Sequence, residues 1–446
     1  MDIGLFAREI TGAEGRDLGE FVGRAIRDGR LPSGTRLPTV RDVAKLLGVS
    51  SGTVATAWTR LRDEGLVVTN RRGGTLVTFD GTGDGESSAA PGWMSVDLSN
   101  GIADPDLQMP LAEALAAGAR TSSLNAPGLE AITAVLLDAV RPSWPFDAEA
   151  FATAAGGSQG ILLAIEAATE AGDTIAIEQP SSPRLLDMAR ARNLKMIGVA
   201  CDAEGPLPHE LARALEQAPA AFVYQPRAHI PLGHVVSERR IAELAAVLTA
   251  SPSTAIVEDD NVGPIAELSS HSLGAHLPDR TIHMRAYCRT FGLDLRTSVL
   301  GGARRLIDRA LQARSRGAVM QSRILQSAMA HLITNPQSQQ RLAQAQRRYA
   351  WRRTTLIKAL ASHGVVAANP DGIMVWIEVA DERTALISLA SYGIAAGAGS
   401  KCFLDPPPRS FLRIATSRLP DDRKLIGQLA ATIAKAIFVG SRQGFD

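Results

Sequence analysis

The chain lacks the features that mark several common protein classes. It has only three cysteines, Cys201, Cys288 and Cys402, and their wide spacing suits neither a disulfide framework nor a zinc site. The longest apolar runs, such as Ile161–Ile165, are too short to span a bilayer. The start, Met1–Arg8, lacks the basic-then-apolar order of a signal peptide. These absences predict a soluble, reduced, cytoplasmic protein.

An excess of charge of one sign is also missing. The 47 basic and 46 acidic residues give a net charge of +1, so no global field attracts nucleic acid, and a DNA site must be a local basic patch. Six lysines against 41 arginines, with abundant alanine, are typical of a GC-rich bacterial genome. A chain of 446 residues that is 45% hydrophobic is too long for one compact domain and predicts two or three.

Three sections follow one another along the chain. Residues 1–79 are expected to form a compact domain, in which a charged helical pattern ends in a hairpin. Residues 80–95 are rich in Gly and Ser, which indicates a flexible linker. Residues 96–446 alternate helical patterns with short β-rich runs such as Thr174–Ile177. That order predicts an α/β domain with a mainly parallel central sheet, and a smaller subdomain over about residues 363–446.

The first section has the element order of a winged helix-turn-helix. Its expected elements are helices over residues 17–27, 40–47 and 50–64 and strands over residues 66–69 and 75–78. Thr39 and Ser50 are the expected N-caps of the second and third helices. The third helix would then lie in a major groove, while the two strands form the wing. The alternative is another small helical domain with solvated arginines.

This section resembles the GntR family of bacterial regulators. The matching segments are Gly34–Arg41, Leu46–Ser50, Thr53–Val54 and Gly73–Thr75. The expected DNA-contacting residues are Arg36, Arg41, Ser50, Ser51, Thr53, Thr56, Arg71, Arg72, Gly73 and Gly74. Ser51 stands where the family often has arginine, so the commonest bidentate contact to guanine is missing.

The large section resembles fold-type I aminotransferases, and a winged helix joined to such a body resembles the MocR subfamily of GntR regulators. Gly156–Gly160 precedes an apolar helix, whose first N–H groups suit a phosphate. The resemblance assigns Gly157, Ser158 and Gln159 to the phosphate of pyridoxal phosphate. It assigns Asp259 to the pyridinium nitrogen, Arg296 to the phosphate and Arg413 to a substrate carboxylate.

Four positions depart from that family. In the segment Ala286–Arg296, Arg289 stands where aminotransferases have the lysine that forms the Schiff base. A guanidinium stays protonated and offers no free amine. Ile230, Asn261 and Ser182 replace an asparagine, a tyrosine and a ring-stacking aromatic residue. We therefore expect an inactive aminotransferase-like domain with no bound cofactor, noncovalent pyridoxal phosphate being the alternative.

The vacated pocket has two interpretations. Arg289 either pairs with Asp259 or joins Arg184, Arg296 and Arg413 in binding an anion. The expected pocket residues are Gly157, Ser158, Gln159, Ser182, Arg184, His229, Asp259, Asn261, Arg289, Arg296 and Arg413. His229 has no partner nucleophile or acidic orienter in the sequence around it, so a structural or ligand-contacting role is favoured over a catalytic one.

Three functions remain open. The first is a DNA-binding transcriptional regulator whose aminotransferase-like domain dimerises head to tail and senses an anionic small molecule. Its operator would be a repeat of short half-sites, and no membrane or metal is expected. The second is a pyridoxal phosphate-dependent aminotransferase, or a regulator that responds to that cofactor. The third is a structural DNA-binding dimer without a ligand. Position 289 discriminates between the first and the second.

Overall fold

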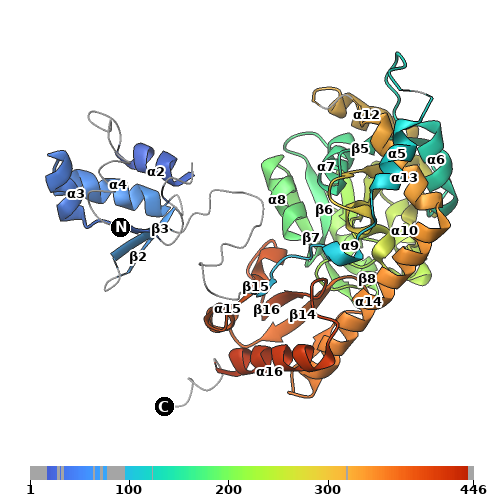
Figure 1. Cartoon of the computed structure of the whole chain (residues 1–446). Helices are drawn as coiled ribbons and strands as arrows, with labels where there is room; N and C mark the ends of the chain where they lie inside the picture. The colour runs from blue at the N-terminus through green and yellow to red at the C-terminus, as the bar shows by residue number, and fades with distance from the viewer. Residues whose placement is uncertain are drawn as a thin grey trace. The chain divides into compact units, whose positions relative to one another are not determined.

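The chain forms two compact units, Met1–Ser95 and Val96–Asp446, in a computed structural model (Figure 1). The structure describes residues 18–27, 31, 35–63, 66–70, 74–77, 96–122, 124–317 and 320–439. The expected linker over residues 80–95 therefore lies outside the described residues. Among the helices within those ranges, none combines the length and apolar character needed to cross a bilayer.

The first unit has the elements of a winged helix-turn-helix. They are α2 (Leu18–Arg27), β1 (Arg36–Leu37), α3 (Val40–Leu47), α4 (Ser51–Asp63), β2 (Val67–Asn70) and β3 (Gly74–Val77). The strands form an antiparallel sheet in the order β1-β3-β2. Val22 and Ile26 of α2 pack with Val54 and Leu61 of α4 in one apolar cluster. The helices therefore present one apolar stripe each to a common core.

The large unit is built around an eight-stranded sheet in the order β5-β12-β11-β10-β9-β6-β7-β8. Its strands are β5 (Ala150–Ala154), β6 (Thr174–Gln179), β7 (Lys195–Asp202), β8 (Gly205–Pro206), β9 (Ala221–Tyr224), β10 (Ala255–Asp260), β11 (Thr281–Ala286) and β12 (Ser298–Gly302). The neighbours from β11 through β7 pair in parallel, whereas β12 runs antiparallel to both its neighbours. The predicted mainly parallel sheet is confirmed.

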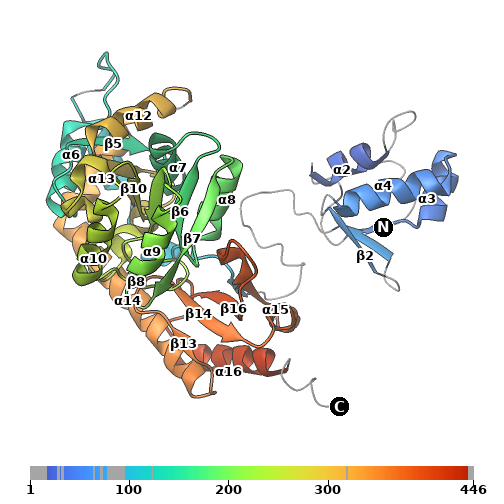
Figure 2. The same cartoon turned by 180° about the vertical axis from the view of Figure 1, so that it is seen from behind.

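Helices cover both faces of this sheet (Figure 1, and from behind in Figure 2). One face carries α7 (Gly157–Ala168), α8 (Pro183–Ala191) and α12 (Arg304–Arg314), and the other carries α9 (Pro208–Leu215) and α10 (Glu238–Thr249). The unit also contains α5 (Ala112–Ala119), α6 (Ala134–Val140), α11 (Cys288–Phe291) and α13 (Arg323–Thr334). Successive residues of β9 alternate between the faces: Val223 packs with α7 and α8, and Phe222 and Tyr224 pack with α9 and α10. Strands covered in this way read as continuous apolar runs.

A second, five-stranded sheet has the order β13-β14-β16-β15-β4. Its elements are β4 (Val96–Leu98), β13 (Ala367–Ala368), β14 (Met374–Val379), β15 (Ile394–Ala398) and β16 (Ser410–Ala415), with α14 (Pro336–Ala361), α15 (Glu382–Ser391) and α16 (Arg423–Val439). The first strand of the unit, β4, pairs in parallel with β15. The small subdomain thus includes a strand that lies far outside residues 363–446. A strand of three residues is too short to be recognised from its sequence.

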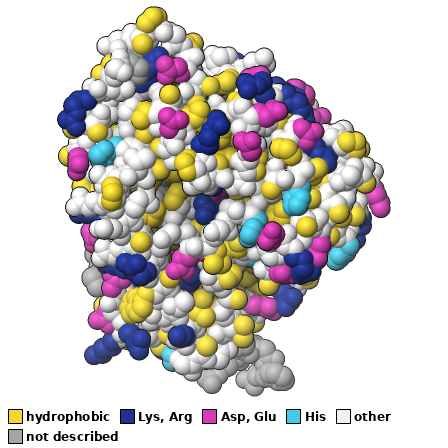
Figure 3. All heavy atoms as spheres, turned by 90° about the vertical axis from the view of Figure 1, so that its right-hand side faces the viewer, with side chains coloured by type: hydrophobic (Ala, Val, Ile, Leu, Met, Phe, Trp, Pro, Cys, Tyr) yellow, Lys and Arg dark blue, Asp and Glu magenta, His cyan; other side chains and the backbone are white. Residues whose placement is uncertain are grey.

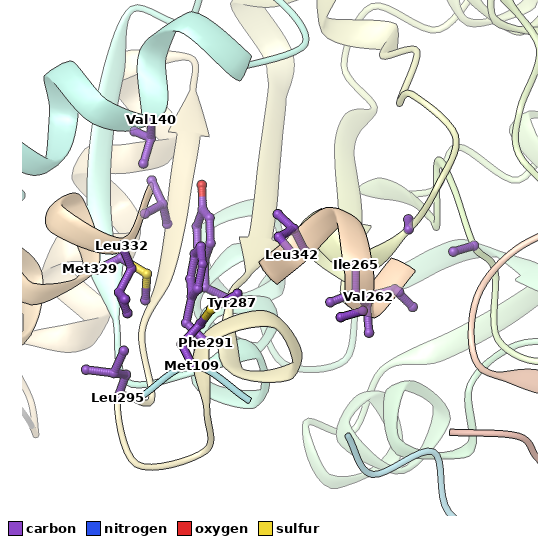
Figure 4. Close-up of a cluster of buried hydrophobic side chains, with 14 of the residues drawn as sticks. Met109, Val140, Val262, Ile265, Tyr287, Phe291, Leu295, Met329, Leu332 and Leu342 are labelled. Atoms are coloured by element: carbon purple, nitrogen blue, oxygen red, sulfur yellow. The ribbon is translucent and has the colours of Figure 1, made fainter. Parts of the chain in front are cut away.

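The segment around position 289 lies on an apolar cluster. Figure 4 shows Tyr287 and Phe291 among Met109, Leu295 and Met329. The rings of Tyr287 and Phe291 are nearly parallel, with centroids 6.1 Å apart, and both residues are buried. Because interior side chains are close-packed, these two neighbours fix the backbone that carries residue 289.

Candidate functional site

The turn between α3 and α4 is built from capping residues. Thr39 accepts a hydrogen bond from the backbone N–H of Asp42, and Gly48 ends α3 in the left-handed conformation at φ 66°. The side chain of Ser50 accepts a hydrogen bond from the N–H of Thr53 at 3.0 Å, so it caps α4. Both N-caps expected from the sequence are present, and they set where the second helix of the motif begins.

One face of α4 is open to solvent. Ser51, Thr53 and Thr56 are exposed, whereas Val54 and Trp58 are buried in the core of the unit. Arg41, on the first turn of α3, is exposed as well. The 3.6-residue period thus separates a core face from the face that would enter a major groove.

The wing is the hairpin of β2 and β3. Gly74 has φ 77°, a conformation that favours glycine. Arg36 of β1 lies beside it, because a Cβ on Gly74 would come within 3.9 Å of the Arg36 side chain. Arg36 is exposed next to the wing. Arg71, Arg72 and Gly73, expected at the tip, lie outside the described residues.

In the large unit, the loop from β5 into α7 makes close contacts that need glycine. A Cβ on Gly157 would lie 2.9 Å from that of Ala286, and one on Gly160 would lie 2.5 Å from the Ser298 hydroxyl. The first N–H groups of a helix have no intrahelical partner. Ser158 accepts a hydrogen bond of 2.6 Å from Arg184. The start of α7 therefore offers donors and a cation in the place where aminotransferases bind phosphate.

A small cavity of about 10 Å³ adjoins this helix start, room for about one water molecule. Of the expected pocket residues, the structure brings together Gly157, Ser158, Ser182, Arg184, Asp259 and Asn261 as its lining. Ile161, Leu185 and Met188 complete the lining. It lies at the carboxyl ends of parallel strands, where ligands bind in open α/β sheets.

Asp259, on β10, is buried, and within the described residues its Oδ1 has no hydrogen-bond partner. Its pKa is raised to about 7, chiefly by burial and then by the nearby Glu178 carboxyl, while Arg289 and Arg184 oppose the shift. An isolated charge in a low-dielectric site is costly, so the carboxyl is protonated more readily than in water.

Arg289 is held by Asn261. Its Nη1 donates to the backbone oxygen and to Oδ1 of Asn261, both at 2.8 Å, and its Nε donates to Gly101 O at 3.2 Å. Burial lowers the pKa of Arg289, and Arg184 adds to the effect. The expected ion pair with Asp259 is wrong. Asn261, two residues further on, offers two oxygens that satisfy the guanidinium instead.

Besides Arg289, four expected pocket residues do not line the cavity. The side chain of Gln159 accepts a hydrogen bond from Ala155 N at 2.6 Å. Arg296 is exposed, and its backbone carbonyl lies near Gly156. Arg413 is on β16, where its Nε donates to Ala398 O. Of the four arginines expected to converge on one pocket, Arg184 alone lines this cavity, so their convergence stays a prediction.

His229, the fourth, lies in a separate buried cluster. Its Nε2 is 3.3 Å from Glu178 Oε1, and its ring stacks on His234 with centroids 4.2 Å apart. Burial lowers the pKa of both histidines to about 3 and raises that of Glu178 to about 8. Sequence reasoning missed Glu178 and His234, because they come from two separate segments with no spacing signal.

These residues do not fit pyridoxal phosphate bound through a Schiff base. The position that would supply the amine carries Arg289, and that guanidinium is bonded to Asn261. The lining of the cavity contains no lysine, and its volume is about 10 Å³. What remains compatible with the cofactor is Asp259, whose Oδ1 is unpartnered where a pyridinium nitrogen would be bound.

Comparison with known proteins finds a matching family for each of the two units of the chain. Residues 17–77 match the gntR family of bacterial regulatory proteins, and residues 99–425 match aminotransferase class I and II. The vitamin B6 salvage pathway transcriptional repressor PtsJ of Salmonella typhimurium is 30% identical over 96% of this chain and 99% of its own length. The pyridoxine biosynthesis transcriptional regulator PdxR of Corynebacterium glutamicum is 27% identical over 59% of this chain and 60% of its own.

Solved aminotransferases share the fold of the large unit. A kynurenine aminotransferase of Pyrococcus horikoshii has a TM-score of 0.71 at 16% identity and covers 80% of this chain and 93% of its own. A multiple substrate aminotransferase of Thermococcus profundus has a TM-score of 0.69 at 17% identity and covers 78% and 92%. At these identities the likeness extends to the fold alone.

Proposed function

This chain belongs to the GntR-type regulators of the MocR subfamily, in which a helix-turn-helix domain is joined to an aminotransferase class I and II domain, and we propose that it regulates transcription without Schiff-base chemistry. The winged helix would bind the operator. The large unit would act as a dimerising and effector-sensing module rather than as an enzyme, and a role on DNA places the protein in the cytoplasm.

The observation that carries this proposal is the state of Arg289. A Schiff base needs a free amine, and the guanidinium at this position is engaged by two oxygens of Asn261. The apolar packing of Tyr287 and Phe291 holds the segment in that place. No rotation of Arg289 alone would supply the missing amine.

DNA binding is tested by footprinting the full-length protein on the region upstream of its own coding sequence. The proposal predicts a protected operator of repeated half-sites that competitor DNA of unrelated sequence does not displace. On the face seen in Figure 3, Lys and Arg side chains lie among Asp and Glu side chains. This mixed charge fits a DNA interface that is confined to the winged helix. Protection that unrelated DNA abolishes at equal concentration would refute sequence-specific regulation.

A second candidate function is a response to vitamin B6 itself. Asp259 is retained with an unpartnered Oδ1 beside the start of α7, and relatives are named for vitamin B6 salvage and for pyridoxine biosynthesis. A vitamer would then bind without a covalent bond, after the cavity opens. A thermal-shift screen of pyridoxal phosphate, pyridoxine and unrelated anionic metabolites separates this candidate from another anionic effector and from a scaffold that binds no ligand.

We further propose that the protein is a homodimer, arranged head to tail. Large apolar side chains are exposed on the large unit, among them Leu129, which is 69% exposed, and Val135, which is 48% exposed. Exposed apolar surface of this kind suits a partner. Light scattering at micromolar concentration should give about twice the chain mass of 47.2 kDa. A clean monomer at that concentration would reject the dimer.

A further inference from the structure

Three side chains with metal-binding atoms meet at the carboxyl ends of strands in the eight-stranded sheet. Glu178 lies near the end of β6, Cys201 near the end of β7, and His234 in the loop that follows β9. One ligand atom from each lies within 4.8 Å of the other two. Because parallel strands end at the same edge of a sheet, three segments distant in sequence supply one cluster.

The polar atoms of this cluster have little else to bind. Oε1 of Glu178 accepts hydrogen bonds from the backbone and the side chain of Gln225, at 2.8 and 2.9 Å. Within the described residues, Oε2 of Glu178 and both ring nitrogens of His234 have no partner. The Cys201 thiol makes a weak contact, 3.7 Å to Val199 O, besides a contact with the Gln179 backbone. Buried polar atoms are rarely left without a hydrogen-bond partner. Several unpaired polar atoms in one cluster therefore need an explanation.

We propose that Glu178, Cys201 and His234 bind a divalent transition metal ion of the zinc type. A thiolate, an imidazole and a carboxylate form a ligand set that zinc accepts, whereas magnesium and calcium prefer oxygen alone. Tetrahedral zinc holds its ligand atoms about 3.3–3.8 Å apart. Contraction of the observed cluster by roughly 1 Å would therefore complete the site, with a water molecule as the fourth ligand.

His229 has a supporting place in this arrangement. Its Nε2 lies 3.3 Å from the Glu178 atom that Gln225 already binds. The two Gln225 hydrogen bonds orient Glu178, His229 lies close to the same oxygen, and Oε2 is left for the ion. Residues that contact a metal ligand without touching the metal orient that ligand and tune the affinity of the site for the metal. The site stands apart from Schiff-base chemistry and from the DNA interface, so its test is independent of the proposed function.

The experiment uses untagged, full-length protein freed of metal and titrated with zinc against a competing chelator dye. The variants are Cys201→Ser and His234→Gln, and Cys402→Ser, a free cysteine outside the cluster, is the matched control. Loss of an outer partner alone weakens metal sites 10–100-fold. We therefore expect one zinc per chain in the wild type and the control, and affinity at least about 100-fold lower in both ligand variants.

Cobalt provides a spectroscopic readout that begins with the wild type. The wild type loaded with cobalt should show a thiolate-to-cobalt absorption band, which Cys201→Ser loses and Cys402→Ser keeps. Bound zinc should also raise the thermal unfolding midpoint of the wild type, because it binds the native state. Absence of the thiolate band in the wild type, or zinc binding that neither ligand variant weakens, would overturn the site and leave a buried water or a shared proton as the occupant.

Discussion

Asp259→Asn is expected to stabilise the protein in alkaline solution and to remove part of its pH dependence. The folded-state pKa of Asp259 is about 7, against an ordinary value of 3.8. The native state therefore binds more protons than the unfolded state between these values, and stability is lost as the pH rises toward 7. Each pKa unit is worth about 1.4 kcal/mol. The asparagine variant should gain roughly 3 kcal/mol over the wild type between pH 5 and pH 9.

Urea unfolding of both proteins across that pH range measures the difference. Glu178, whose pKa is raised to about 8, titrates in both proteins and leaves a residual slope. The control is Asp187→Asn, an exposed carboxylate that pairs with Arg190, which should leave the curve unchanged. If the Asp259→Asn and wild-type curves stay parallel from pH 5 to pH 9, then Asp259 has a charged partner in the folded protein.

Arg41→Ala is expected to weaken operator binding by roughly 1–3 kcal/mol, or about 5–150-fold, if Arg41 contacts a base. Arg41 is exposed on the first turn of α3, in the same helix-turn-helix as the open face of α4. If it contacts a phosphate instead, the loss should be uniform across sequences, and the salt dependence of log Kd should decrease by about one unit. Fluorescence anisotropy on the footprinted operator, at several salt concentrations, distinguishes the two.

Arg190→Ala serves as the matched control for that measurement. Arg190 is exposed on α8 of the large unit and pairs with Asp187, so its loss removes the same charge far along the chain from the winged helix. The control should bind the operator with wild-type affinity. Equal affinities for the wild type and Arg41→Ala would remove Arg41 from the interface.

The fold was predictable from the sequence where local chemistry decides it. Thr39 and Gly48 bound α3 at the residues that the capping pattern indicated, and short apolar strands between helices led to the parallel sheet. β4 was not predictable, because a three-residue strand pairs with β15 almost 300 residues later. Pairings of that kind depend on tertiary packing, which local sequence does not encode.

The candidate site was predictable only in part. The motif placed Asp259, Arg184 and Ser158 together, and they line one cavity. It did not reveal that the Arg289 guanidinium would donate to Asn261, because opposite charge favoured Asp259 as its partner. Cysteine spacing argued against a zinc site, and it had no bearing on a cluster that joins single residues from three segments.

The most direct test of the account is whether the protein forms a covalent bond with pyridoxal phosphate. The purified protein is incubated with the cofactor and reduced with borohydride, and its intact mass is measured. Because Arg289 stands in the Schiff-base position and is bonded to Asn261, we expect an unchanged mass, with only trace labelling spread over surface lysines. A stoichiometric pyridoxyl adduct that maps to a single lysine would contradict it and restore the enzyme hypothesis.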